Sequence, residues 1–157
     1  MAALSLSFCG AEVLRPDGLS TAPLHLAEGQ IVDRQMPKQV DLSGFLVLPG
    51  IVDIHGDGFE RHLAPRRGAM KERSEGLVAA EAEFASNGIT TAVLAQFYSW
   101  EGGLRGPEFA DSVLSALAET RASLVTDLHG QLRFETHMLD EFADLPAKLK
   151  RWGVSYV

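Results

Sequence analysis

Hydrophobic and polar residues follow two different patterns along the chain, and the change falls near residue 50. In residues 1–49 apolar positions alternate with polar ones in short runs, as in Leu4–Phe8, and turn residues interrupt them. Alternation with a period of two is typical of strands that expose one face. No run here has a helical period, so we predict a small β-sandwich-like domain over residues 1–49.

Two local signals support strands in this part. The segments Leu24–Ala27 and Ile31–Asp33 flank Glu28-Gly29-Gln30, which predicts a hairpin around a glycine turn. A further short strand is expected at Phe45–Leu48, where Pro49-Gly50 ends it.

From residue 51 onward, apolar runs of strand type alternate with runs of helical spacing. Gly88, Pro107 and Gly153 stand where helix ends and starts are expected. Ile51–Ile54 has the composition of a buried strand, and a Gly-, Arg- and His-rich loop is expected after it, through Gly68. Further strands are predicted at 90–95, 124–128 with an extension to 134, and 154–157, and helices at 74–87, 107–121 and 146–152.

This alternation predicts a parallel sheet with right-handed crossovers, an α/β fold. Units of roughly 30 to 40 residues are typical of a (β/α)8 barrel of the TIM type. We therefore expect residues 50–157 to form the first three to four βα units of a truncated barrel, since a complete barrel has eight such units.

Composition indicates the cellular compartment and the kinds of partner to expect. The net charge of −7 argues against a general affinity for nucleic acid or acidic lipid. Cys9 is the only cysteine, which fits a reducing compartment. No run approaches the roughly 18 apolar residues of a membrane span, and the N-terminus has no signal-peptide pattern. We expect a cytoplasmic protein with neither a membrane nor a nucleic-acid partner.

The strongest chemical signal is His55-Gly56-Asp57, which follows the apolar run. Alternate residues of a strand share a face, so an imidazole and a carboxylate would point the same way at one strand end. Such a pair can chelate a cation such as Zn²⁺. Two solvated polar side chains at a strand end are the alternative.

The surrounding residues carry a family resemblance. The run 48–55, Leu-Pro-Gly-Ile-Val-Asp-Ile-His, after a small β unit resembles the opening of amidohydrolase-superfamily enzymes. The run 53–61, with Pro65-Arg66 after it, resembles the phosphonate-metabolism branch, the alpha-D-ribose 1-methylphosphonate 5-triphosphate diphosphatases, which release pyrophosphate. Residues 88–91 and 132–135 also resemble that branch. The likeness runs from about residue 45 to residue 140.

The resemblance implies a metal-dependent hydrolase. It implies that His55, Asp57 and Glu135 bind one or two divalent metal ions, with zinc expected. By the same likeness the first barrel strand carries two of these ligands. Asp53 shares a face with His55, and we expect it to orient His55 from below. Further ligands and the general base lie on later strands, so no catalytic residue is assigned and the 157-residue chain is expected to be inactive alone.

The resemblance also implies the substrate. Arg61 and Arg66 are expected to bind a small phosphorylated molecule, whose phosphoanhydride would be cleaved in phosphonate catabolism. Gly58, Arg67 and Gln131 depart from the residues common in that branch.

Several alternatives stay open. Glu135 can be solvated, or held by the guanidinium of Arg133 two residues earlier. The enzyme can instead cleave a C–N bond, as deacetylases and cyclic amidases of the superfamily do; a neutral amide would not require the arginine-rich loop. The chain can also be a non-catalytic truncated module. The oligomeric state is also left open, with a homo-oligomer as one alternative.

Overall fold

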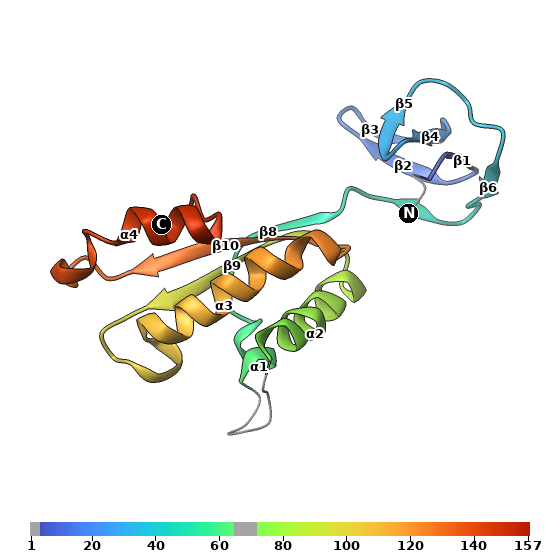
Figure 1. Ribbon diagram of the computed structural model, residues 1–157. Helices are drawn as coiled ribbons and strands as arrows, with labels where there is room; N and C mark the ends of the chain where they lie inside the picture. Colours follow the sequence, from blue (N-terminus) through green and yellow to red (C-terminus); the bar gives the residue numbers. More distant parts are fainter. Residues whose placement is uncertain (1–3, 65–71) are drawn as a thin grey trace. The chain divides into compact units, whose positions relative to one another are not determined.

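The computed structural model describes residues 4–64 and 72–157. The chain divides into two compact units, Met1–Pro49 and Gly50–Val157 (Figure 1). Arg66, predicted to bind substrate, lies outside the described residues. None of the helices in the described ranges is long and apolar enough to cross a membrane.

The first unit consists of two small sheets. One has the strand order β5-β4-β1-β6 and the other β3-β2-β7. Leu6, Val13 and Met36 are buried between their neighbours. The sandwich-like character predicted for this unit is confirmed. The strands are β1 (Leu6–Cys9), β2 (Glu12–Arg15), β3 (Gly18–Ser20), β4 (Leu24–Ala27), β5 (Gln30–Val32), β6 (Gln39–Asp41) and β7 (Leu46–Val47).

The predicted hairpin is confirmed. β4 and β5 pair antiparallel, with Ala27 opposite Gln30. The two residues between them, Glu28 and Gly29, have φ values of 51° and 76°. A two-residue hairpin loop with both φ values positive matches the twist of the flanking strands.

The second unit is a parallel three-stranded sheet with helices packed against it. The strand order is β10-β9-β8, and the helices run alongside the strands (Figure 1). Tyr156 forms an isolated parallel bridge to Gln131, which is the pairing found within the predicted fourth strand at 154–157. The elements are β8 (Ile51–Gly56), α1 (Glu60–Leu63), α2 (Arg73–Ser86), β9 (Ile89–Tyr98), η1 (Gly103–Arg105), α3 (Pro107–Thr120), η2 (Arg121–Ser123), β10 (Asp127–Phe134), η3 (Leu139–Glu141) and α4 (Leu145–Trp152).

The core lies between the sheet and the helices. Leu94 of β9 and Leu128 and Leu132 of β10 are buried in one cluster with side chains of the helices, including Leu77 and Leu114. Because neighbouring residues of a strand point to opposite faces, Ala95, Phe97, Gln131 and Arg133 occupy the other face. We call this second surface the opposite face.

Three expectations need correction. Residues 124–126 are not strand, because β10 pairs with β9 only from Asp127 onward. The stretch after β8 contains the short helix α1, which starts after a turn at residues 57–59, where only a loop was expected. Ile51, Val52 and Ile54 look buried in the sequence but are 54%, 58% and 69% exposed, because β8 is an edge strand of the described sheet.

Candidate functional site

The ends of the parallel strands bring the candidate residues to one edge of the sheet. β8, β9 and β10 end at Gly56, Tyr98 and Phe134. In (β/α)8 barrels the carboxyl ends of the strands carry the active site. His55 lies at this edge, one residue before β8 ends.

His55 contacts a residue that lies two strands away. Its Nδ1 is 2.6 Å from Oε1 of Gln131 on β10. Gln131 pairs with Ala95 of the intervening strand, and this small side chain leaves room for the ring and the amide to meet. An amide oxygen can only accept, so in this arrangement Nδ1 is the donor, and in a neutral imidazole Nε2 then keeps its lone pair.

Asp53 acts on the backbone at the end of β8. Its Oδ1 accepts a hydrogen bond from the N–H of His55 at 3.1 Å. A Cβ added to Gly56 would stand 2.7 Å from Asp53 Oδ2, so glycine leaves space for this carboxylate. Asp53 thus contacts the main chain of His55 and not its imidazole, and its orienting role stays a prediction.

Asp57 follows β8 directly and is exposed. Its carbonyl oxygen accepts the backbone N–H of Glu60 at the start of α1. The pKa of Glu60 is raised by burial first and by the nearby Asp57 second, while Arg105 and Arg133 oppose the rise. These four charged groups therefore lie within electrostatic reach of one another.

Glu135 lies in a different environment. Its Oε2 accepts the backbone N–H of Trp100 at 3.3 Å and is 3.6 Å from Nε2 of His137. Trp100 and His137 contribute to the wall of a pocket of about 450 Å³ formed by the loops after β9 and β10. The alternative pairing with Arg133 is not among the ion pairs of the described residues.

The three predicted metal ligands are not gathered into one cluster. Within residues 4–64 and 72–157, no group of three or more His, Cys, Asp or Glu side chains could hold a metal ion. His55 Nδ1 is engaged by Gln131, and Glu135 contacts Trp100 and His137. These residues alone do not fit a divalent cation, and the ligand roles of His55, Asp57 and Glu135 stay a prediction.

Arg61, the other predicted substrate ligand, is paired with Glu83 of α2. His62 also contacts this carboxylate, with Nε2 2.6 Å from Oε2. The hydrogen bond from His62, helped by Arg61, holds the pKa of Glu83 below its usual 4.5. The two side chains of α1 therefore join it to α2, and the Arg61 side chain is 62% exposed in this pair.

The structure shows a pair of arginines that the sequence did not indicate. Arg133 and Arg105 both place their guanidinium groups over the ring of Phe97. The available signal was the alternation of Asp127, His129, Gln131 and Arg133 along one strand, which puts four polar side chains on one face.

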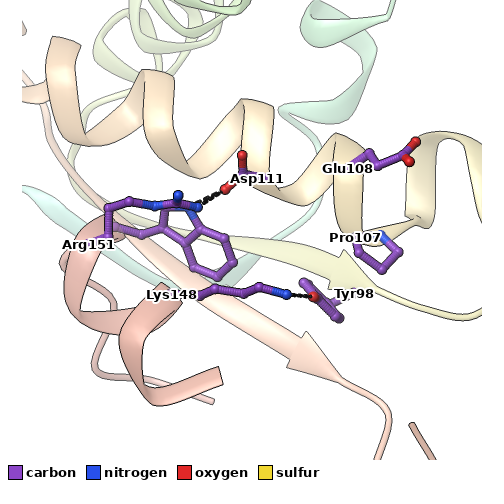
Figure 2. A pocket seen from close by; sticks show the side chains of 7 residues that line it. Tyr98, Pro107, Glu108, Asp111, Lys148 and Arg151 are labelled. Atoms are coloured by element: carbon purple, nitrogen blue, oxygen red, sulfur yellow. Dashed lines mark hydrogen bonds and ion pairs between the residues drawn. The ribbon is translucent and has the colours of Figure 1, made fainter. Parts of the chain in front are cut away.

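A second pocket lies on the helical side. It measures about 250 Å³ and is lined by residues of β9, α3 and α4. Nζ of Lys148 donates a hydrogen bond to the Tyr98 hydroxyl at 2.7 Å, and Arg151 is paired with Asp111 (Figure 2). Lys148 also forms an ion pair with Glu141. These contacts of Lys148 and Arg151 join α4 to the rest of the unit.

Comparison with known proteins identifies the fold. No protein-family model and no curated protein matches the sequence. Among solved structures, dihydropyrimidinase from Brevibacillus agri is 18% identical, with a TM-score of 0.56 over 91% of this chain and 31% of that one. D-hydantoinase is 19% identical, with a TM-score of 0.59 over 96% of this chain and 32% of that one. The chain thus spans about a third of their length and shares the fold of that part.

Proposed function

We propose that this chain is the N-terminal part of a hydrolase of the amidohydrolase superfamily that cleaves a C–N bond in a cyclic amide. The observation that carries the proposal is the place of His55, at the carboxyl end of the first parallel strand and on the opposite face. The similarity in fold to a dihydropyrimidinase and a D-hydantoinase supports it. That similarity favours a cyclic amide of the hydantoin or dihydropyrimidine type as substrate.

The geometry of His55 suits such a reaction. Gln131 fixes the proton on Nδ1, so Nε2 presents a lone pair at the strand edge. A nitrogen held in one tautomer can accept a proton or bind an electrophile without first reorganising. The divalent ion, zinc in the sequence-based hypothesis, stays part of the proposal for a longer chain, because donors beyond His55 and Asp57 would have to come from elsewhere.

Hydrolysis of a ribosyl triphosphate is the second candidate. The motif of residues 53–61 favours it. It ranks behind amide cleavage because the solved structures similar in fold are a dihydropyrimidinase and a D-hydantoinase. Arg66 lies outside the described residues.

The test uses a protein that carries this chain together with the remaining strands of a barrel. It is assayed with divalent metal on a cyclic amide and on a ribosyl 5-triphosphate. We expect ring opening without pyrophosphate release, abolished by His55→Asn. His129→Asn is the matched control, because His129 lies near the start of β10 and pairs with Asp127. Release of pyrophosphate alone would establish the second candidate, and no turnover of either substrate would refute both.

A further inference from the structure

Two guanidinium groups meet one aromatic ring at the carboxyl edge of the sheet. Cζ of Arg133 is 3.8 Å and Cζ of Arg105 is 4.4 Å from the ring centroid of Phe97. Arg133 and Phe97 are register partners, each one residue before its strand ends. Arg105 comes from η1, in the segment that follows β9. Residues from two strands and a loop thus converge here.

Stacking uses the face of a guanidinium and leaves its edge free. The N–H donors of arginine lie in the plane of the group, so a stacked arginine can still bind a carboxylate or phosphate through two parallel hydrogen bonds. Among the residues the structure describes, Arg133 has no hydrogen-bond acceptor and no ion-pair partner, although its side chain is partly buried. Glu60 acts on Arg133 through space, without a hydrogen bond or an ion pair, so this partly dehydrated cation can still gain a direct anionic partner.

Arg105 adds a second positive charge at the same ring. Its Nη1 donates to Oε2 of Glu101 at 3.0 Å, and both side chains are about half exposed. Exposed pairs four residues apart contribute little to stability, so Arg105 can exchange this partner for a ligand at small cost. The negative face of the Phe97 ring attracts both cations.

The arginines lie close to His55. Arg133 and Gln131 share the opposite face two residues apart, which is about 6.6 Å along a strand. Gln131 is the residue that contacts the His55 imidazole. An anion bound by Arg133 would therefore lie within the length of a small molecule from Nε2 of His55.

We infer that Arg133 and Arg105, supported by Phe97, form a binding site for an oxyanion, the carboxylate or phosphate group of a small-molecule substrate. Only the identification of the bound molecule as substrate rests on the proposed function. Anion binding itself does not. This site is additional to the predicted substrate contacts of Arg61 and Arg66, which stay a prediction.

The experiment is a calorimetric titration of the 157-residue chain with inorganic phosphate and, separately, with malonate. We expect saturable binding of one anion per chain, and the tighter of the two identifies the group as phosphate or carboxylate. Arg133→Gln should weaken the affinity about tenfold or more, since a bidentate charged contact is lost. Arg121→Gln makes the same change of charge beside Asp127, where β10 starts, and should change the affinity less than about twofold, as expected for an exposed charge.

Two further variants separate binding from folding. Arg133→Lys keeps the charge and the aliphatic stem but loses the fork, so its affinity should fall between those of the wild type and Arg133→Gln. Phe97→Leu should weaken binding while thermal unfolding remains cooperative. The inference is overturned if neither anion shows saturable binding. It is also overturned if Arg133→Gln and Arg121→Gln lose the same affinity. Neither result decides the hydrolysis assay, which measures ring opening and pyrophosphate release rather than the affinity for an anion.

Discussion

At the scale of single residues, the chemistry of the candidate site depends on which ring nitrogen of His55 carries the proton. Gln131 accepts from Nδ1, and a net hydrogen bond of about 1 kcal/mol changes a population ratio roughly fivefold. We predict that Gln131→Leu lowers the ratio of Nδ1-protonated to Nε2-protonated His55 about fivefold. Nitrogen NMR in alkaline solution, where imidazoles are neutral, measures this ratio.

His25 is the internal control for this measurement. Its Nδ1 is 2.7 Å from Oγ of Ser7, in the other compact unit. The tautomer ratio of His25 should be the same in the wild type and in Gln131→Leu. An unchanged His55 ratio would mean that Gln131 does not set the tautomer.

Sequence reasoning at the residue scale found His55 but not the residues around it. His55 and Asp57 belong to one contiguous motif, so the sequence alone indicates them. The contacts of His55 with Gln131 and of Arg133 with Phe97 join residues 76 and 36 positions apart, and the register of the sheet decides them. The same register separates Glu135 from His55, which no local pattern indicates.

Element boundaries were predictable wherever a local residue sets them. α3 starts at Pro107 as expected, and α4 ends before Gly153, whose φ of 68° is the left-handed helix cap. The start of β10 was missed because it depends on remote partners. Thr126 gives its backbone N–H to Glu81 and its hydroxyl to the carbonyl of Ile89, so the strand pairing begins one residue later.

The fit between β10 and α3 gives a prediction about stability. A Cβ on Gly130 would stand 2.9 Å from Leu114 Cδ2 and 3.0 Å from Val154 Cγ2. Overpacking of a closed core costs roughly 1–3 kcal/mol, so Gly130→Ala should lower the free energy of unfolding by about that amount. Gly58→Ala is the control, because its Cβ would meet nothing within 4 Å. Urea denaturation of both variants decides the matter, and equal stabilities would contradict the packing described here.

The junction between α1 and α2 gives a prediction about pH. The pKa of Glu83 is lowered in the folded protein, mainly by the hydrogen bond from His62. Its contribution to stability is therefore fully present above the unfolded value near 4.5 and is lost as the pH falls through the folded value. Glu83→Gln should lower the urea midpoint at neutral pH, and the difference from wild type should vanish in acid. Glu119→Gln, on the exposed side of α3, should show no such pH dependence. A Glu83→Gln effect that is equal at both pH values would exclude this role for the charge.

At the scale of the whole molecule, the second unit has an edge without a neighbour. β8 pairs with β9 on one side, and on the other side no strand of the described residues reaches it. Ile51, Val52 and Ile54 are more than half exposed there. An apolar edge strand is a template for pairing with another chain, and this bears on the oligomeric state that the sequence left open.

We therefore predict that the purified 157-residue chain self-associates through β8. Ile54→Lys should shift the sedimentation profile toward the monomer at equal concentration, because a charged side chain on an edge strand opposes strand addition. Val125→Lys places the same charge at a residue that is 85% exposed but outside the strands, and it should leave the profile unchanged. If both lysine variants sediment like the wild type, the association does not involve this edge. If both become monomeric, the cause is net charge rather than the edge of the sheet. Only a shift confined to Ile54→Lys is consistent with the exposed side chains of β8 forming the contact.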